Sequence, residues 1–335
     1  MKKTAILATA IAAVIAAPLA TAAKHEGKGP HVTVYGKAHV SVDNYDVADN
    51  WRVDSNSSRL GFKGSEDLGN GMTAKFQYEI GYDMTDGGAF GGARNSWVGL
   101  AGGFGEVRIG RHDTPAKTAL YAAGNERLGD SIMDLHGSFG FAELRSSNVI
   151  AYINKFGDLS FIGAIIPGEG NNATGNNGLT DAISVALMYK AGPIKASLGI
   201  TDAADAIGTG ATADLMNLGG SYSISDTINV GLQYQTVDRG NVERTAFALT
   251  GEIGLGDGLS VALAMGTAED DAAGVTTEAD VIGAALKKKM SKRTSAYFAY
   301  VDGDETPNNL PNQWIGNGGT TANGSAFSVG VVHSF

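Results

Sequence analysis

Residues 32–42 read VTVYGKAHVSV, and apolar and polar side chains alternate along this stretch. The apolar face carries Val32, Val34, Ala38, Val40 and Val42, and the opposite face carries Thr33, Tyr35, Lys37, His39 and Ser41. The side chains of a β-strand alternate between two faces with a period of two residues. The stretch therefore predicts a strand that has one apolar face and one wet face.

The same alternation recurs along the chain, in residues 73–83, 183–190, 195–201 and 228–235. Short connections are expected at 64–71, 102–105, 155–158, 191–193, 223–227, 254–258 and 290–293. Long polar connections are expected near 43–57, 83–93, 112–147, 167–180, 201–213, 236–244, 267–279 and 302–325. Short turns that alternate with long loops predict about sixteen antiparallel strands in an up-and-down order.

The composition excludes several classes of protein. The chain has 335 residues, of which 48 are glycine, none is cysteine and 18% are charged. Without cysteine there is no disulfide scaffold, thiolate zinc site or cysteine nucleophile. A formal net charge of −10 argues against a general nucleic-acid binder, which needs a basic surface. After the first residues no run of 18 apolar residues occurs, so the sequence predicts no transmembrane helix there.

The first residues have the pattern of an export signal. Lys2 and Lys3 precede a short apolar run at 4–17, and Pro18 then breaks the run before Ala20-Thr21-Ala22. A basic start, a short apolar segment and a small-residue cleavage pattern are typical of a secretory signal peptide. We therefore predict a cleaved signal peptide at 1–22 and a single β-domain at 23–335.

An exported chain of alternating strands is either a secreted sandwich or a membrane barrel. A sandwich needs only about seven to ten strands, and its connections mix in length. Long loops at one end and tight turns at the other are typical of an outer-membrane barrel. The last strand places Phe327, Val329, Val331, His333 and Phe335 on one face, so the chain ends on an aromatic residue suited to close the barrel. Sixteen strands enclose a lumen too wide for side chains to fill, which predicts an aqueous channel.

Several stretches make the chain resemble the general diffusion porins of Gram-negative bacteria, particularly the Neisseria and Burkholderia branch. The matching motifs are VYGK at 34–37, SRLGFKG at 58–64 with EDLG at 66–69, RNSWVGL at 94–100, GEVRIGR at 105–111 and the terminal Phe335. The resemblance implies a sixteen-stranded barrel in the outer membrane whose third long loop, about 112–147, folds into the lumen. It also implies a homotrimer, contacts with outer-membrane lipid and lipopolysaccharide, and insertion by the barrel-assembly machinery through the C-terminal strand.

The resemblance also assigns a charged constriction. Its basic side matches Lys37, Arg59, Arg94 and Arg145, with Arg111 as a further candidate. The alternation of the first strand independently places Lys37 on the wet face. The acidic side is expected in the third loop, where Glu126, Asp130, Asp134 and Glu143 are candidates and those that face the pore stay open. Opposite charges across a narrow wet gap create a transverse field that orients dipolar solutes.

Catalytic and metal-binding interpretations are weaker. Histidines stand at positions 25, 31, 39, 112, 136 and 333. His39 and Ser41 share a strand face, but both types are common on wet faces, so chance explains the pair better than a hydrolase. His112 and Asp113 lack a second ligand pair at recognisable spacing. We therefore expect no enzyme activity, no metal and no cofactor.

The leading hypothesis is a porin that passes ions and small hydrophilic solutes by passive diffusion. One alternative is a surface barrel whose long loops act mainly as an adhesin or receptor. Another is a channel selective for one class of solute, which differs only in the side chains lining the lumen. The overall charge does not decide the ion preference, because screening over about 8–10 Å makes the local ring of charge dominate.

Overall fold

The computed structural model describes residues 30–46, 50–87, 90–168, 178–203, 214–240, 242–272, 274–303 and 324–335. The predicted signal peptide at 1–22 and most of the predicted loops at 167–180, 201–213 and 302–325 lie outside these residues. The described strands are β1 (His31–Tyr45), β2 (Asn50–Ser55), β3 (Arg59–Gly69), β4 (Met72–Gly81), β5 (Ala93–Gly102), β6 (Gly105–Asp113), β7 (Arg145–Phe156), β8 (Leu159–Ile166), β9 (Ala182–Ala191), β10 (Ile194–Asp202), β11 (Asp214–Ser223), β12 (Ile228–Asp238), β13 (Val242–Gly256), β14 (Leu259–Ala272), β15 (Val275–Lys289), β16 (Thr294–Gly303) and β17 (Gly324–Ser334). Two helices, α2 (Pro115–Ala122) and α3 (Leu135–Ser138), lie between β6 and β7.

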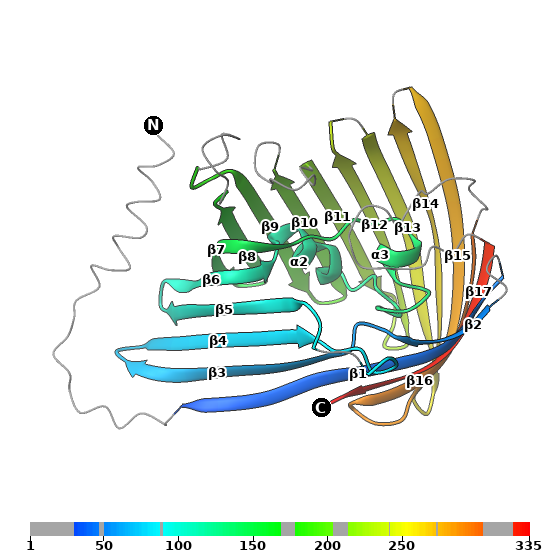
Figure 1. The fold of residues 1–335 in the computed structure, drawn as a ribbon, viewed down its shortest axis with the longest axis horizontal. Coiled ribbons are helices and arrows are strands. Elements are labelled where there is room, and N and C mark those ends of the chain that lie inside the picture. The colour runs from blue at the N-terminus through cyan, green and yellow to red at the C-terminus, as the bar shows by residue number, and fades with distance from the viewer. Residues whose placement is uncertain are drawn as a thin grey trace.

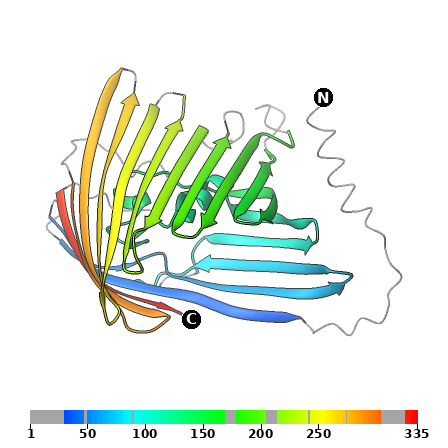
Figure 2. The same ribbon diagram turned by 180° about the vertical axis from the view of Figure 1, so that it is seen from behind.

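The strands form one closed antiparallel barrel. From β3 to β17 each strand pairs with the next along the chain, and β1 pairs with β17 on one edge and with β2 and β3 on the other. β2 faces the end of β1 from Val40 to Tyr45, and β3 faces its beginning from His31 to Lys37. β2 and β3 therefore share one position in the wall. The barrel has sixteen strand positions, as the sequence predicted, and its strands curve around α2 and α3 (Figures 1 and 2).

The predicted alternation of faces is confirmed. On β1, His39, Ser41 and Asp43 are buried toward the interior, whereas Val32 and Val34 are each 55% exposed. Apolar side chains also lie exposed on the outer face of the other strands, among them Ile109, Leu187, Ile200, Leu232, Leu263, Ile282, Val329 and Val331. An apolar exterior and a polar interior are the arrangement that a barrel in a bilayer requires.

Three of the predicted long connections are much shorter in the structure. β1 runs to Tyr45 and β2 lies at 50–55, both within the predicted loop at 43–57, and β13 already begins at Val242 within the predicted loop at 236–244. β14 and β15 extend to Ala272 and from Val275, so the predicted loop at 267–279 reduces to a tight turn. A run of polar residues shows where a strand emerges from the membrane's apolar layer. The strands continue beyond this layer, because their backbone groups still pair with those of neighbouring strands.

The segment between β6 and β7 packs against the inward face of the barrel. Thr114 caps α2 by accepting a hydrogen bond from the backbone N–H of Lys117 at 3.2 Å, and Pro115 occupies the first turn. The apolar side chains of the segment between β6 and β7 are buried in one cluster with alanines on the inward face of the barrel. The cluster includes Leu120, Met133, Leu135, Phe139 and Phe141 of the segment and Ala246, Ala248, Ala262, Ala264 and Ala299 of the barrel. Burial of each large side chain contributes about 1.5–3 kcal/mol. The small alanines leave the room that this segment fills.

Polar side chains of the wall also hold this segment by its backbone. Asn217 donates to the carbonyl of Ala116 at 2.9 Å, and Ser221 donates to the carbonyl of Ala123 at 2.6 Å. Gln235 accepts from the N–H of Ala142 and donates to its carbonyl, at 2.5 and 2.8 Å. Buried backbone groups need partners, and these side chains supply them where no sheet neighbour is available.

Candidate functional site

The basic residues of β1 and β3 face the loop across the lumen. Lys37 and Arg59 are direct partners in the β1–β3 register, so both side chains point to the same face. Lys37 donates a hydrogen bond to the carboxylate of Asp130, and the guanidinium of Arg59 lies 3.5 Å from the same carboxylate. Asp130 has φ of 56° at the tip of the loop, which presents its side chain to the wall. Three predicted constriction residues therefore meet at one point.

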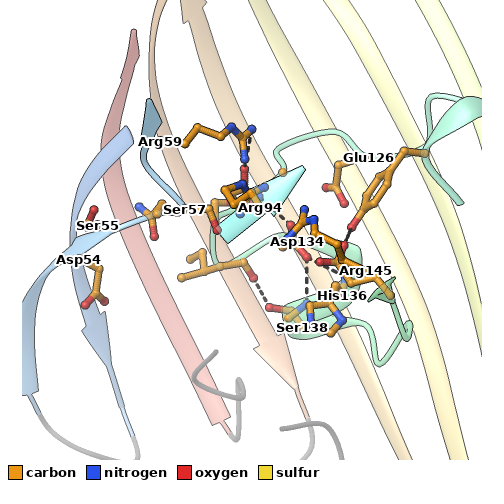
Figure 3. A pocket seen from close by; sticks show the side chains of 18 of the residues that line it. Asp54, Ser55, Ser57, Arg59, Arg94, Glu126, Asp134, His136, Ser138 and Arg145 are labelled. Atoms are coloured by element: carbon orange, nitrogen blue, oxygen red, sulfur yellow. Dashed lines mark hydrogen bonds and ion pairs between the residues drawn. The ribbon is translucent and has the colours of Figure 1, made fainter. Parts of the chain in front are cut away.

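Arg94 of β5 is paired within the wall. Its Nε lies 2.6 Å from Oε1 of Glu79 on β4, and the hydroxyl of Tyr35 donates to Oε2 of Glu79 at 2.9 Å. Glu79 was not predicted as a constriction acid, although the alternation of β4 places it on the wet face. Arg94 and Arg59, both labelled in Figure 3, line the same cavity.

Arg145 belongs to a second group at the base of the loop. Arg145 and Lys117 approach Oδ1 of Asp113 at 2.9 and 3.4 Å, and Lys117 also approaches Glu143 at 2.6 Å. The hydroxyl of Tyr121 donates to the other oxygen of Glu143. Sequence reasoning did not select Lys117, yet it stands four residues after Asp113 at the start of a helix, a spacing that brings two side chains together.

The remaining loop acids, Glu126 and Asp134, serve the loop itself. Asp134 caps α3 by accepting from the N–H groups of His136 and Gly137 at 2.7 and 2.9 Å, and it also accepts from the N–H of Asp130. Glu126 accepts from the N–H of Leu135 at 3.0 Å. Both carboxyls hold the turn that presents Asp130, and neither forms an ion pair with a predicted basic residue among the described residues.

Arg111 forms no ion pair with the described residues, although it lies close enough to Arg145 and Asp113 to interact with them electrostatically. Its guanidinium donates to the carbonyl of Ala93 and to the hydroxyl of Ser147, both at 2.8 Å. The β6–β7 register shifts between Gly110 and His112, so the alternation of β6 is interrupted immediately beside Arg111. Lys37 and Arg59 therefore meet at Asp130, and Arg59, Arg94 and Arg145 line one cavity whose lining does not include Arg111.

The surroundings of the loop acids set their charge states. Burial raises the pKa of Asp130, but Lys37 and Arg59 outweigh burial and hold its pKa below the usual value. Burial likewise opposes ionisation of Glu143, and Lys117 and His136 reverse that effect, so the pKa of Glu143 is also lowered. For Glu126, burial and the nearby Asp134 raise the pKa well above normal. Burial and the nearby Asp130 and Glu143 raise the pKa of Asp134 as well.

These groups surround a water-accessible cavity of about 650 Å³. Its lining includes Arg59, Arg94 and Arg145 from the wall and Asp130 and Glu143 from the loop. In Figure 3 the labelled arginines approach the cavity from several strands, while Glu126, Asp134 and His136 approach from the loop. Positive charge from the wall and negative charge from the loop therefore meet across the gap, which Glu79 and Asp113 of the wall and Lys117 of the loop also line.

Other features bear on alternative functions. His39 pairs with the hydroxyl of Tyr297 at 2.9 Å, while Ser41 donates to Asp43. Within the described ranges, no group of three or more histidine, aspartate or glutamate side chains is placed to hold a metal ion. No helix in that part of the chain is long and apolar enough to cross a membrane.

Comparison with known proteins agrees with this architecture. Residues 8–308 match the family described as Gram-negative porin. The chain belongs to the Gram-negative porin family. It is 28% identical to outer membrane porin protein 32 of Delftia acidovorans, over 91% of this chain and 94% of that protein. It is 36% identical to the chitoporin of Vibrio furnissii over 43% of each chain.

A solved structure places the fold in the same family. The anion-selective porin from Comamonas acidovorans superposes with a TM-score of 0.69 at 25% identity, covering 91% of this porin and all of that chain. As an outer-membrane porin, the protein forms a channel for passive diffusion, and the family and fold are those of a channel. The sequence-based prediction of family, barrel and location is therefore confirmed.

The structure extends the prediction for the C-terminus without testing its role in insertion. The backbone N–H and carbonyl of Phe335 both pair with Gly36, at 3.1 and 3.0 Å. Its ring covers Gly36 so closely that a Cβ there would lie 2.3 Å from the ring. Phe335 therefore closes the barrel onto β1.

Proposed function

We propose that the charged residues between the barrel wall and the loop form the selectivity constriction of this porin. Ions and small hydrophilic solutes would cross it by passive diffusion, in a step that needs no catalytic residue. The observation that carries the proposal is the meeting of Lys37 and Arg59 from the wall with Asp130 from the loop beside a water-accessible cavity. Fixed opposite charges beside water orient dipolar solutes and disfavour large apolar ones.

The arrangement supports a weak preference for anions. Five basic side chains, Lys37, Arg59, Arg94, Lys117 and Arg145, pair with four carboxylates, those of Glu79, Asp113, Asp130 and Glu143. Burial raises the pKa of both Glu126 and Asp134, which disfavours a negative charge on these two acids. Because each cation has a carboxylate close by, the preference remains small. A related structure is named as anion-selective, which agrees with this sign.

Planar bilayer recording tests the proposal. The reversal potential in a potassium chloride gradient reports the chloride-to-potassium permeability ratio. The double variant Arg59→Gln with Arg94→Gln should shift the ratio toward potassium while the channel still conducts. Arg111→Gln removes the same type of charge at a side chain that does not line the cavity, and it should shift the ratio less than either Arg59→Gln or Arg94→Gln.

Absence of stepwise conductance from the pure protein would overturn the porin proposal and favour a surface barrel that acts as an adhesin or receptor. An unchanged reversal potential in the double variant would overturn the constriction assignment. Saturation of the current by one sugar class at low concentration would instead indicate a solute-specific channel.

We also infer that the porin assembles as a homotrimer in contact with outer-membrane lipid and lipopolysaccharide, and that its C-terminal strand engages the barrel-assembly machinery. A porin fold that matches this chain is described in a trimer form, which supports the assembly. Crosslinking of the protein in native outer membranes should give a species of three chains. If crosslinking yields only single chains, the trimer inference is contradicted.

A further inference from the structure

A second cavity of about 550 Å³ lies beyond the constriction, at the end of the barrel that carries the short turns. Arg127, Leu128 and Gly129 of the loop form one side of it. The β13–β14 and β15–β16 turns and the end of β17 form the other side. Gly129 also borders the constriction cavity, so the two cavities share one loop residue as their boundary. In outer-membrane barrels the end with short turns faces the periplasm.

The lining of this second cavity is strongly basic. It contains Arg127, Lys287, Lys289, Lys292 and Arg293, but a single carboxylate, that of Glu252. Lys287 pairs with Glu252 at 2.9 Å and donates to the carbonyl of Arg127 at 2.8 Å. The single carboxylate is therefore already paired with Lys287. In the proposed constriction, by contrast, the number of carboxylates nearly equals the number of basic side chains.

The other basic side chains have no such partner. For the side chains of Lys289, Lys292 and Arg293, no hydrogen bond or ion pair occurs with the residues that the structure describes. Arg127 donates from Nε to Thr250 at 3.0 Å, but its buried Nη2 has no partner in that same part of the chain. A buried guanidinium nitrogen without an acceptor costs free energy, and a ligand oxygen would supply the acceptor.

The run 287–289 supplies an internal comparison. Lys287 and Lys289 are separated by one residue on a strand, so both face the cavity. Lys288, between them, is exposed on the outer face and donates to the carbonyl of Asp257 at 2.6 Å. Three adjacent lysines thus divide into two that face the lumen and one that does not.

We propose that this periplasmic cavity is a binding site for small multivalent anions that carry phosphate or several carboxylates. Its uncompensated guanidinium and ammonium groups match the geometry and charge of phosphate oxygens. The inference rests on the proposed function, because such an anion reaches the site through the open lumen. The site holds the anion at the mouth after it crosses the constriction.

Single-channel recording with inorganic pyrophosphate as the probe tests this inference. Pyrophosphate added to the side with the short turns should reduce the potassium chloride current, most strongly at the polarity that drives anions inward. Lys289→Gln with Arg293→Gln should raise the half-blocking concentration by roughly tenfold, because two nearby positive charges are lost. Lys288→Gln, the matched control, should leave it unchanged.

The outcomes separate this inference from the proposed function. A channel that conducts but is blocked from neither side overturns the anion site and leaves the porin function intact. Equal effects of the Lys288 and Lys289 substitutions also overturn it, since only total charge would then matter. If anionic lipid in the bilayer abolishes the block, the basic residues hold lipid headgroups instead. Failure to conduct at all overturns the proposed function first.

Discussion

Asp130 in the loop accepts a hydrogen bond from Lys37 on β1, although the two residues are 93 positions apart in the sequence. The contact joins the tip of the loop to the wall opposite α2, which itself packs against β9, β10 and β11. The loop is thereby held from both sides of the lumen, and we expect the width of the proposed constriction to depend on this contact.

Asp130→Asn should increase the preference for chloride. Removal of the carboxylate leaves Lys37 and Arg59 without their acidic partner, and two unit charges 4 Å apart in water interact by about 1 kcal/mol. The chloride-to-potassium permeability ratio is therefore expected to rise by up to about fivefold. Reversal potentials in a salt gradient measure it, and Asp158→Asn in a short turn is the control for net charge. A shift of equal size in the control would contradict a local effect.

Lowering the pH should also increase the preference for chloride, but only in strongly acidic solution. The pKa values of Asp130 and Glu143 are held below the usual range by their basic partners, so both stay ionised where ordinary carboxylates begin to protonate. A depressed folded-state pKa contributes stability above the unfolded pKa, and this is lost as pH falls through the folded value. Protonation also removes the negative charges of Asp130 and Glu143 from the lumen. The chloride preference should therefore be steady down to about pH 4 and rise below it. A rise already near pH 6 would contradict the assignment.

Glu126→Gln should preserve the neutral-pH channel and remove a sensitivity to alkali. The raised pKa of Glu126 means that its carboxyl stabilises the loop while protonated, and this contribution is lost as pH rises through the folded value. Glutamine resembles the protonated form and can still accept from Leu135. Conductance at pH 7 should be unchanged, while loop proteolysis at high pH should decrease relative to the native chain. Glu66→Gln, at an exposed position on β3, should change neither.

Gly199→Val should displace α2 from the wall. A Cβ at Gly199 would lie 2.7 Å from both the Cα of Ala116 and the Cβ of Ala119, so the helix must move. Overpacking of this kind costs typically about 1–3 kcal/mol. The variant should lose resistance to heating in detergent and give a noisier current. At Gly220 an added Cβ meets no atom within 4 Å, so Gly220→Val should keep both properties.

The alternation of strand residues predicted much of the site because period two survives in a regular wall. It placed Lys37 on the wet face of its strand, and in the structure Lys37 reaches Asp130 of the loop inside the barrel. Arg111 lies beside a register shift where Gly110 has φ of 143°, and alternation cannot be followed through such an irregularity.

The different roles of the loop acids could not be predicted from the sequence. Asp130, Asp134 and Glu126 lie within nine residues, and only the folded loop distinguishes the acid that faces the wall from those that hold backbone N–H groups. The alanines of β13, β14 and β16 were equally uninformative, because small residues suit a lipid face and a packed interior alike. Their role depends on the aromatic side chains that the loop brings to them.

The pairing of β1 with β17 has a consequence for biogenesis. β1 and β17 are neighbours in the wall although they are far apart in the sequence, so the barrel cannot close until β17 has been synthesised. Until then both free edges would present unpaired backbone groups that invite aggregation. A chain whose β1 and β17 have not yet paired is therefore prone to aggregate, and this pairing removes both exposed edges at once.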